Sequence, residues 1–84
     1  MDVLQTYNGA AIKDDMISKG WRSIDLWQAA NRCLAQRRAP LISIDSARRV
    51  LRGESHNPKI VTALARALGK TERDYRQPTR KARK

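Results

Sequence analysis

The chain has 84 residues, which limits it to one small domain, and 40% of them are apolar, which is enough for a folded globule. Its formal net charge of +10 points to a polyanionic partner, nucleic acid first and an anionic membrane surface second. The single cysteine excludes an internal disulfide. The sequence shows no signal peptide and no apolar run near the roughly 20 residues of a membrane span, so a cytoplasmic protein with no membrane partner is expected.

The apolar residues recur with helical rather than alternating spacing, which predicts an all-α fold of about five helices. The first helix runs from about Gly9 to Lys19, with Asn8 as its N-cap and Ile12 and Met16 on one face. A glycine follows, and glycine accepts the left-handed conformation in which many helices end. Residues 1–7 fit either a flexible arm or a short leading turn.

The second predicted helix begins after Ser23, a good N-cap, with Asp25 in the first turn, where the helix dipole favours an anion. It continues to about Arg38, because Pro40 blocks a helix beyond that point. Its stripe at spacings of three and four comprises Leu26, Ala29, Ala30, Cys33, Leu34 and Arg37. We interpret Cys33 as a small buried apolar residue, and Trp21 and Trp27 as core or interface residues rather than base-stacking platforms.

The third predicted helix follows Ser43 and ends at Gly53, with Asp45 in its first turn. Its apolar stripe consists of Ala47, Val50 and Leu51. The spacing therefore predicts a short amphipathic helix over residues 43–52 that carries two arginines on its polar side.

The fourth predicted helix has the strongest start in the chain, with Asn57 as N-cap and Pro58 at the first helical position. Its inward residues are Ile60, Val61, Leu64, Ala65 and Leu68, and Gly69 ends it. A short fifth helix is expected after Thr71, with Tyr75 facing inward. The domain is thus expected over residues 1–78, and the basic segment 79–84 is expected to be a disordered tail.

Three segments together resemble the λ-repressor/Cro family of helix-turn-helix repressors over about residues 10–75. Residues 43–53, SIDSARRVLRG, resemble the recognition helix, and residues 57–70, NPKIVTALARALGK, resemble the fourth helix. Lys19-Gly20-Trp21 followed by Ser23-x-x-Leu26 resembles the turn into the second helix. The resemblance implies a five-helix, λ-repressor-like DNA-binding domain, and Kor-type plasmid regulators or phage repressors are the nearest analogy.

The connection between the two motif helices departs from the family pattern, which usually has a tight turn there. Roughly ten extra residues lie between Ala30 and Ser43. We interpret them as an extension of the second helix through Arg38 and a loop from Ala39 to Ile42. In a second register, the motif starts at Leu34-Ala35 after a longer preceding helix.

The resemblance implies which residues contact DNA, because a helix in the major groove presents side chains to base edges. The implied base-reading residues are Ile44, Asp45, Ser46, Arg48 and Arg49. The implied phosphate contacts are Arg22, Ser23, Arg52, His56 and Lys59. Each also has a purely structural interpretation: arginines can form a solvated helix face, and first-turn acids and serines can simply stabilise a helix start.

These features favour a transcriptional repressor that binds a palindromic operator as a homodimer, with helix five, Thr71 to Gln77, as the expected dimer contact. The alternatives are a non-specific or architectural nucleic-acid binder, and an antitoxin-like module that binds a partner protein. An enzyme is not expected, since the sequence has no nucleophile–base set and no Gly-rich phosphate loop. One cysteine and one histidine cannot form a structural zinc site, and no cofactor or small-molecule ligand is expected.

Overall fold

The computed structural model describes residues 6–77, and within them the chain folds into four α-helices and one short 3₁₀ helix. The α-helices are α1 (Gly9–Ser18), α2 (Ser23–Gln36), α3 (Ile44–Leu51) and α4 (Pro58–Ala67). The prediction of an all-α fold is confirmed for this part of the chain. The short fifth helix expected after Thr71 is a single 3₁₀ turn, η1 (Glu72–Tyr75), and the predicted tail 79–84 lies outside the described residues.

Most of the helix boundaries follow from their caps as predicted. The side chains of Asn8, Ser43 and Asn57 accept hydrogen bonds from backbone N–H groups of the first turns of α1, α3 and α4. The prediction that Ser23 caps α2 is wrong by one residue, because Ser23 is already helical. Asp25 supplies the start signal instead: its Oδ2 accepts a hydrogen bond of 2.8 Å from the backbone N–H of Arg22.

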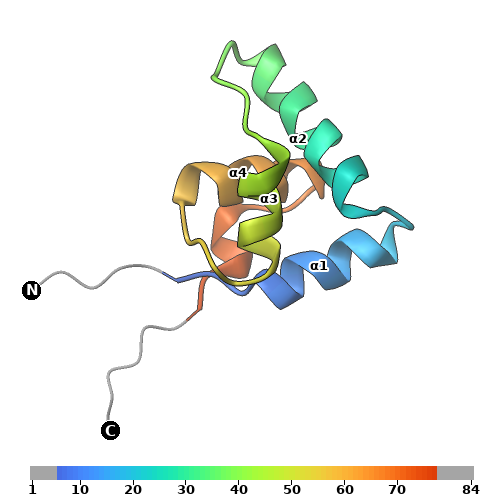
Figure 1. The fold of residues 1–84 in the computed structure, drawn as a ribbon, viewed down its shortest axis with the longest axis vertical. Helices are drawn as coiled ribbons and strands as arrows, with labels where there is room; N and C mark the ends of the chain where they lie inside the picture. Colours follow the sequence, from blue (N-terminus) through green and yellow to red (C-terminus); the bar gives the residue numbers. More distant parts are fainter. Residues whose placement is uncertain (1–5, 78–84) are drawn as a thin grey trace, which may run out of the picture.

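The extension of the second helix is confirmed, although it ends two residues earlier than predicted. α2 has 14 residues and ends at Gln36, and Arg38 then adopts a left-handed φ of 57° that turns the chain back. Leu34 and Ala35 lie inside the last turn of α2, so no second helix starts there. In Figure 1 the end of α2 and the connection that follows extend beyond the other helices.

Two side chains of α2 hold the connection in place at Ile42. Asn31 donates to the carbonyl oxygen of Ile42 at 3.0 Å and accepts from its N–H at 2.9 Å. The indole N–H of Trp27 donates to the same carbonyl oxygen at 2.8 Å. These bonds fix the point at which the chain enters α3, and they give Trp27 a structural role in place of base stacking.

The core is shared by α1, α2, α3 and α4, and because the chain has no Phe it consists of aliphatic side chains and Met16 together with Tyr7 and Tyr75. The inward residues predicted for α4 are buried, and Ile12, Leu26 and Leu64 are fully buried. Trp21 packs against this core as expected. Cys33 does not lie within it, since it is only half-buried near the end of α2, where no helix covers that side completely.

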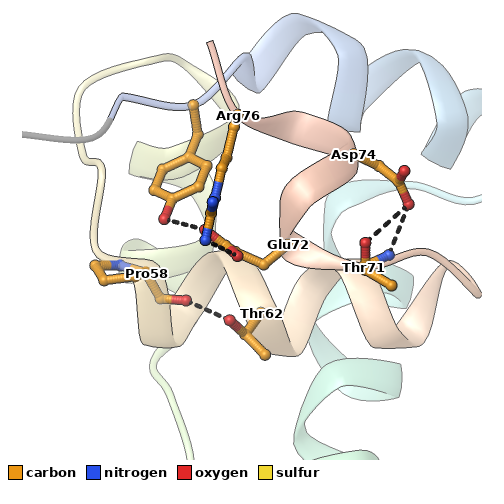
Figure 2. Close-up of polar contacts among 7 residues, drawn as sticks. Pro58, Thr62, Thr71, Glu72, Asp74 and Arg76 are labelled. Carbon is orange, nitrogen blue, oxygen red and sulfur yellow. Dashed lines mark hydrogen bonds and ion pairs between the residues drawn. The ribbon is translucent and has the colours of Figure 1, made fainter. Parts of the chain in front are cut away.

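The two ends of the described chain are joined to each other. Tyr7 forms an isolated antiparallel bridge with Arg76, and its hydroxyl donates to Glu72 Oε2 at 2.6 Å. Figure 2 shows Arg76 paired with Glu72, where Arg76 Nε and Glu72 Oε2 are 2.7 Å apart. Residues 6 and 7 are therefore neither a free arm nor a turn, and residues 1–5 lie outside the described range.

The segment proposed as a dimer contact also packs within its own chain. Tyr75 is buried, and its hydroxyl donates to Asp15 of α1 at 2.5 Å. Burial and the neighbouring carboxylate of Asp15 raise the pKa of Tyr75 above its ordinary value, so the phenol keeps its proton. Tyr75 thus packs within its own chain, whereas Thr71, Arg73, Asp74, Arg76 and Gln77 are exposed, and the predicted dimer contact stays a prediction.

Candidate nucleic-acid interface

The polar side of α3 faces away from the core. Ala47, Val50 and Leu51 are buried against the rest of the domain. Successive residues of a helix are rotated by about 100°, so Asp45 and Arg49 lie almost opposite this buried stripe. Both are exposed, and since they are four residues apart they share one face of the helix.

The other implied base-reading residues have different surroundings. Arg48 is exposed but lies on the flank of α3 that faces α1 and α2. Ser46 is half-buried and belongs to the cap: its N–H donates to Ser43 Oγ at 3.1 Å, and its hydroxyl oxygen accepts from the Ser43 hydroxyl at 3.0 Å. Ile44 is half-buried in the first turn. The structure therefore separates an outward pair, Asp45 and Arg49, from a flanking arginine and two residues at the helix start.

A shallow hollow of about 280 Å³ lies between α1, α2 and α3. It is lined by Ser23 at the start of α2, by Leu51, and by three cationic side chains, Lys13, Arg48 and Arg52. The first N–H groups of a helix have no partner inside that helix, and the helix dipole makes this end positive. A hollow with this lining suits an anion such as a DNA phosphate. Lys13 was not predicted as part of this site, because its neighbours in the sequence, Asp14 and Asp15, are acidic.

Arg52 already has a partner on the surface. Its Nε lies 3.0 Å from Glu54 Oε2, and about half of each side chain is exposed. The hydrogen bond between them raises the pKa of Arg52 and lowers the pKa of Glu54. A phosphate that approached Arg52 would therefore compete with the Glu54 carboxylate. Because the Arg52–Glu54 pair is exposed, its net contribution to stability is small.

The remaining implied phosphate contacts do not line the hollow. His56 is half-buried, and its Nδ1 accepts a 3.0 Å hydrogen bond from the N–H of Tyr7, which gives it a structural role. Lys59 is exposed in the first turn of α4 and lines a different groove, between α2 and α4. Arg22 precedes Ser23 directly; its side chain is 85% exposed and its Nε lies 3.9 Å from Asp25 Oδ2. Of the five residues, Ser23 and Arg52 line the same hollow, and Arg22 precedes Ser23 in the chain.

Comparison of the chain with models of protein families, with curated proteins and with solved structures gave no match. The resemblance to helix-turn-helix repressors therefore stays a prediction from the sequence. Over residues 6–77, no helix combines the length and the apolar character that crossing a membrane requires. The same residues contain no group of three His, Cys, Asp or Glu side chains placed to hold a metal ion.

Proposed function

We propose that this protein is a sequence-specific DNA-binding transcriptional repressor that reads a palindromic operator as a cytoplasmic homodimer. In this proposal α2 and α3 form a helix-turn-helix with a long connection, and α3 enters the major groove. One observation carries the proposal: α3 presents Asp45 and Arg49 outward, while Arg48 faces a cationic hollow at the start of α2. The net charge of +10 supplies the general attraction to a polyanion.

The outward pair has the chemistry for base reading. A guanidinium can donate two hydrogen bonds to O6 and N7 of guanine, and a carboxylate can accept one from N4 of cytosine. No ion pair within residues 6–77 involves Arg49, and its side chain is exposed, so binding a base would cost little rearrangement. We therefore assign sequence reading chiefly to Arg49, with Asp45 as a second contact or as the group that orients it.

The flanking arginine has the surroundings of a phosphate contact. Arg48 shares the hollow with Lys13, Arg52 and the first turn of α2, and contacts of this kind position a protein on DNA without specifying its sequence. The two neighbouring arginines are thus given different roles. This division sharpens the sequence-based prediction, in which both of them read bases.

Selection of bound sequences from random double-stranded DNA tests the proposal, with wild type, Arg49→Ala, Arg48→Ala and Arg32→Ala compared. Arg32 is exposed on α2 and lines neither the hollow nor the groove between α2 and α4, so it is the matched control. We expect wild type to select two half-sites roughly 34 Å apart, and Arg49→Ala to lose preference at defined base pairs, at a cost of about 1–3 kcal/mol.

Arg48→Ala is expected to weaken binding to all sequences and to reduce the slope of log K against log salt by about 1, whereas Arg32→Ala keeps the selected sequence. An unchanged preference in both α3 variants would place the reading surface elsewhere. Strong, salt-dependent binding by wild type without any selected sequence would identify an architectural DNA binder instead.

A further inference from the structure

A groove of about 710 Å³ lies between the second half of α2, the connection over residues 37–43, and α4. Its inner surface includes the apolar side chains of Leu34, Ile42, Ile60 and Ala63. Leu41 stands at its edge with 61% of its surface exposed, which is unusual for a large apolar side chain. The groove shares no residue with the cationic hollow beside α3.

The wall of this groove is held in place before anything binds. The hydrogen bonds that Ile42 forms with Asn31 and Trp27 fix the connection against α2. Ala39 N–H also donates to Leu34 O at 2.9 Å, which closes the end of α2. A preformed apolar groove loses less conformational entropy on binding than a mobile loop would.

The charges along the groove have one sign. Arg37, Lys59 and Arg66 line it, and none of its lining residues is acidic. The ion pairs within residues 6–77 involve other residues, so these three cations have no carboxylate partner there. Lys59 and Arg66 are two turns apart on α4, about 10 Å along its axis. Lys59 also lies at the positive end of α4, where the helix dipole disfavours a cation.

We propose that this groove binds an acidic amphipathic helix of a partner protein. Apolar side chains at positions i, i+3 or i+4, and i+7 would pack on the groove, and flanking carboxylates would pair with Arg37 and Arg66. A second copy of the chain is a poor occupant, because a symmetric contact would bring the three cations of each copy towards those of the other. The exposed edges also favour a helix over a small molecule, whose sites enclose most of the ligand.

A fluorescein-labelled synthetic helix of about 15 residues, with leucines on one face and glutamates on both flanks, serves as the probe. A scrambled peptide of the same composition controls for the general attraction of a basic protein. Binding to the full chain is measured by fluorescence anisotropy for wild type, Arg37→Glu, Arg66→Glu and Leu41→Ser. Arg32→Glu makes the same charge change on α2 outside the groove and is the matched control.

We expect the charge reversals at Arg37 and Arg66 to weaken peptide binding roughly tenfold or more relative to Arg32→Glu, and Leu41→Ser to weaken it as well. When the peptide is titrated into the protein, the backbone amide NMR signals that shift should be those of Leu34, Ile42 and Ala63. Equal binding of the scrambled peptide, or equal weakening by Arg32→Glu, overturns the proposal. If Leu41→Ser instead dissociates a dimer, a second copy of the chain covers the groove. If Arg66→Glu weakens DNA binding as much as it weakens peptide binding, the edge of the groove at Arg66 contacts DNA.

Discussion

Replacing Gly9 by alanine tests how closely α1 approaches α3. Gly9 is buried in the first turn of α1, and a Cβ built there lies 2.3 Å from the carbonyl oxygen of Val50 and 2.9 Å from that of Leu51. Ordinary contact begins at 3.4 Å, so the two backbones must separate by about 1 Å to admit a methyl group. The obstructing atoms are backbone atoms at the end of α3, and no side-chain rotation can move them.

Two effects of opposite sign determine the expected change in stability. Alanine is favoured over glycine in helices by at most about 1 kcal/mol. Overpacking of a well-packed site costs about 1–3 kcal/mol, and a clash with backbone belongs at the upper end of that range. We therefore expect Gly9→Ala to lower the free energy of unfolding by about 1–2 kcal/mol, with a fall in Tm of roughly 4–8 °C per kcal/mol.

Urea denaturation followed by circular dichroism measures this change, and Ala10→Gly is the matched control. Ala10 is exposed in the same turn, so the control loses only helix propensity, about 0.5–1 kcal/mol. Propensity alone predicts opposite signs for the two variants, whereas the packing of α1 on α3 predicts that both destabilise. A Gly9→Ala protein with a midpoint equal to or above that of wild type would refute the close approach.

The other two predictions concern groups that sequence analysis did not select. Asn31→Ala removes the two hydrogen bonds that Asn31 forms with Ile42 and leaves the one from Trp27, so we expect a loss of about 1–2 kcal/mol and faster amide hydrogen exchange at Ile42 than in α4; unchanged exchange at Ile42 would contradict this role. The pKa of Glu72 is held below its ordinary value of 4.5 by hydrogen bonds from Arg76 and Tyr7. Its contribution to stability is thus complete above that value and is lost as the pH falls through the lower folded-state pKa. We expect Tm to differ between wild type and Glu72→Gln at pH 7 and to converge towards pH 3; parallel profiles would contradict the pairing.

Helix positions could be predicted from the sequence because their start and stop signals are local. Asn57 and Pro58 fix the start of α4, and Ser43 fixes the start of α3, through contacts within one turn. The start of α2 was misplaced because Ser23 and Asp25 both favour a helix start, and the sequence does not show which bond forms. A short fifth helix was predicted after Thr71, and it is a 3₁₀ turn, because four residues form too few hydrogen bonds to propagate as an α-helix.

The contacts that join distant segments could not be predicted in this way. Tyr7 and Glu72 are 65 residues apart, and neither carries a local signal for the other. Lys13 was overlooked as part of the cationic hollow because its sequence neighbours are acidic, whereas its spatial neighbours are Arg48 and Arg52. The basic surface at this point therefore depends on the packing of α1 on α3, which local sequence does not show.

The long second helix has a physical consequence that connects the two proposed surfaces. Its last two turns bury little, since only Leu26 and Ala30 of α2 are fully covered, yet ordering each residue costs about 1–2 kcal/mol of backbone entropy. A tight turn after Ala30 would avoid that cost. The extra residues form the wall of the groove. The hydrogen bonds between Asn31 and Ile42 attach the connection to α2, and Ile42 directly precedes Ser43, the N-cap of α3. An occupant that pushed the connection away from α2 would therefore also shift the start of α3, so binding in the groove and binding of DNA by α3 should be coupled reciprocally.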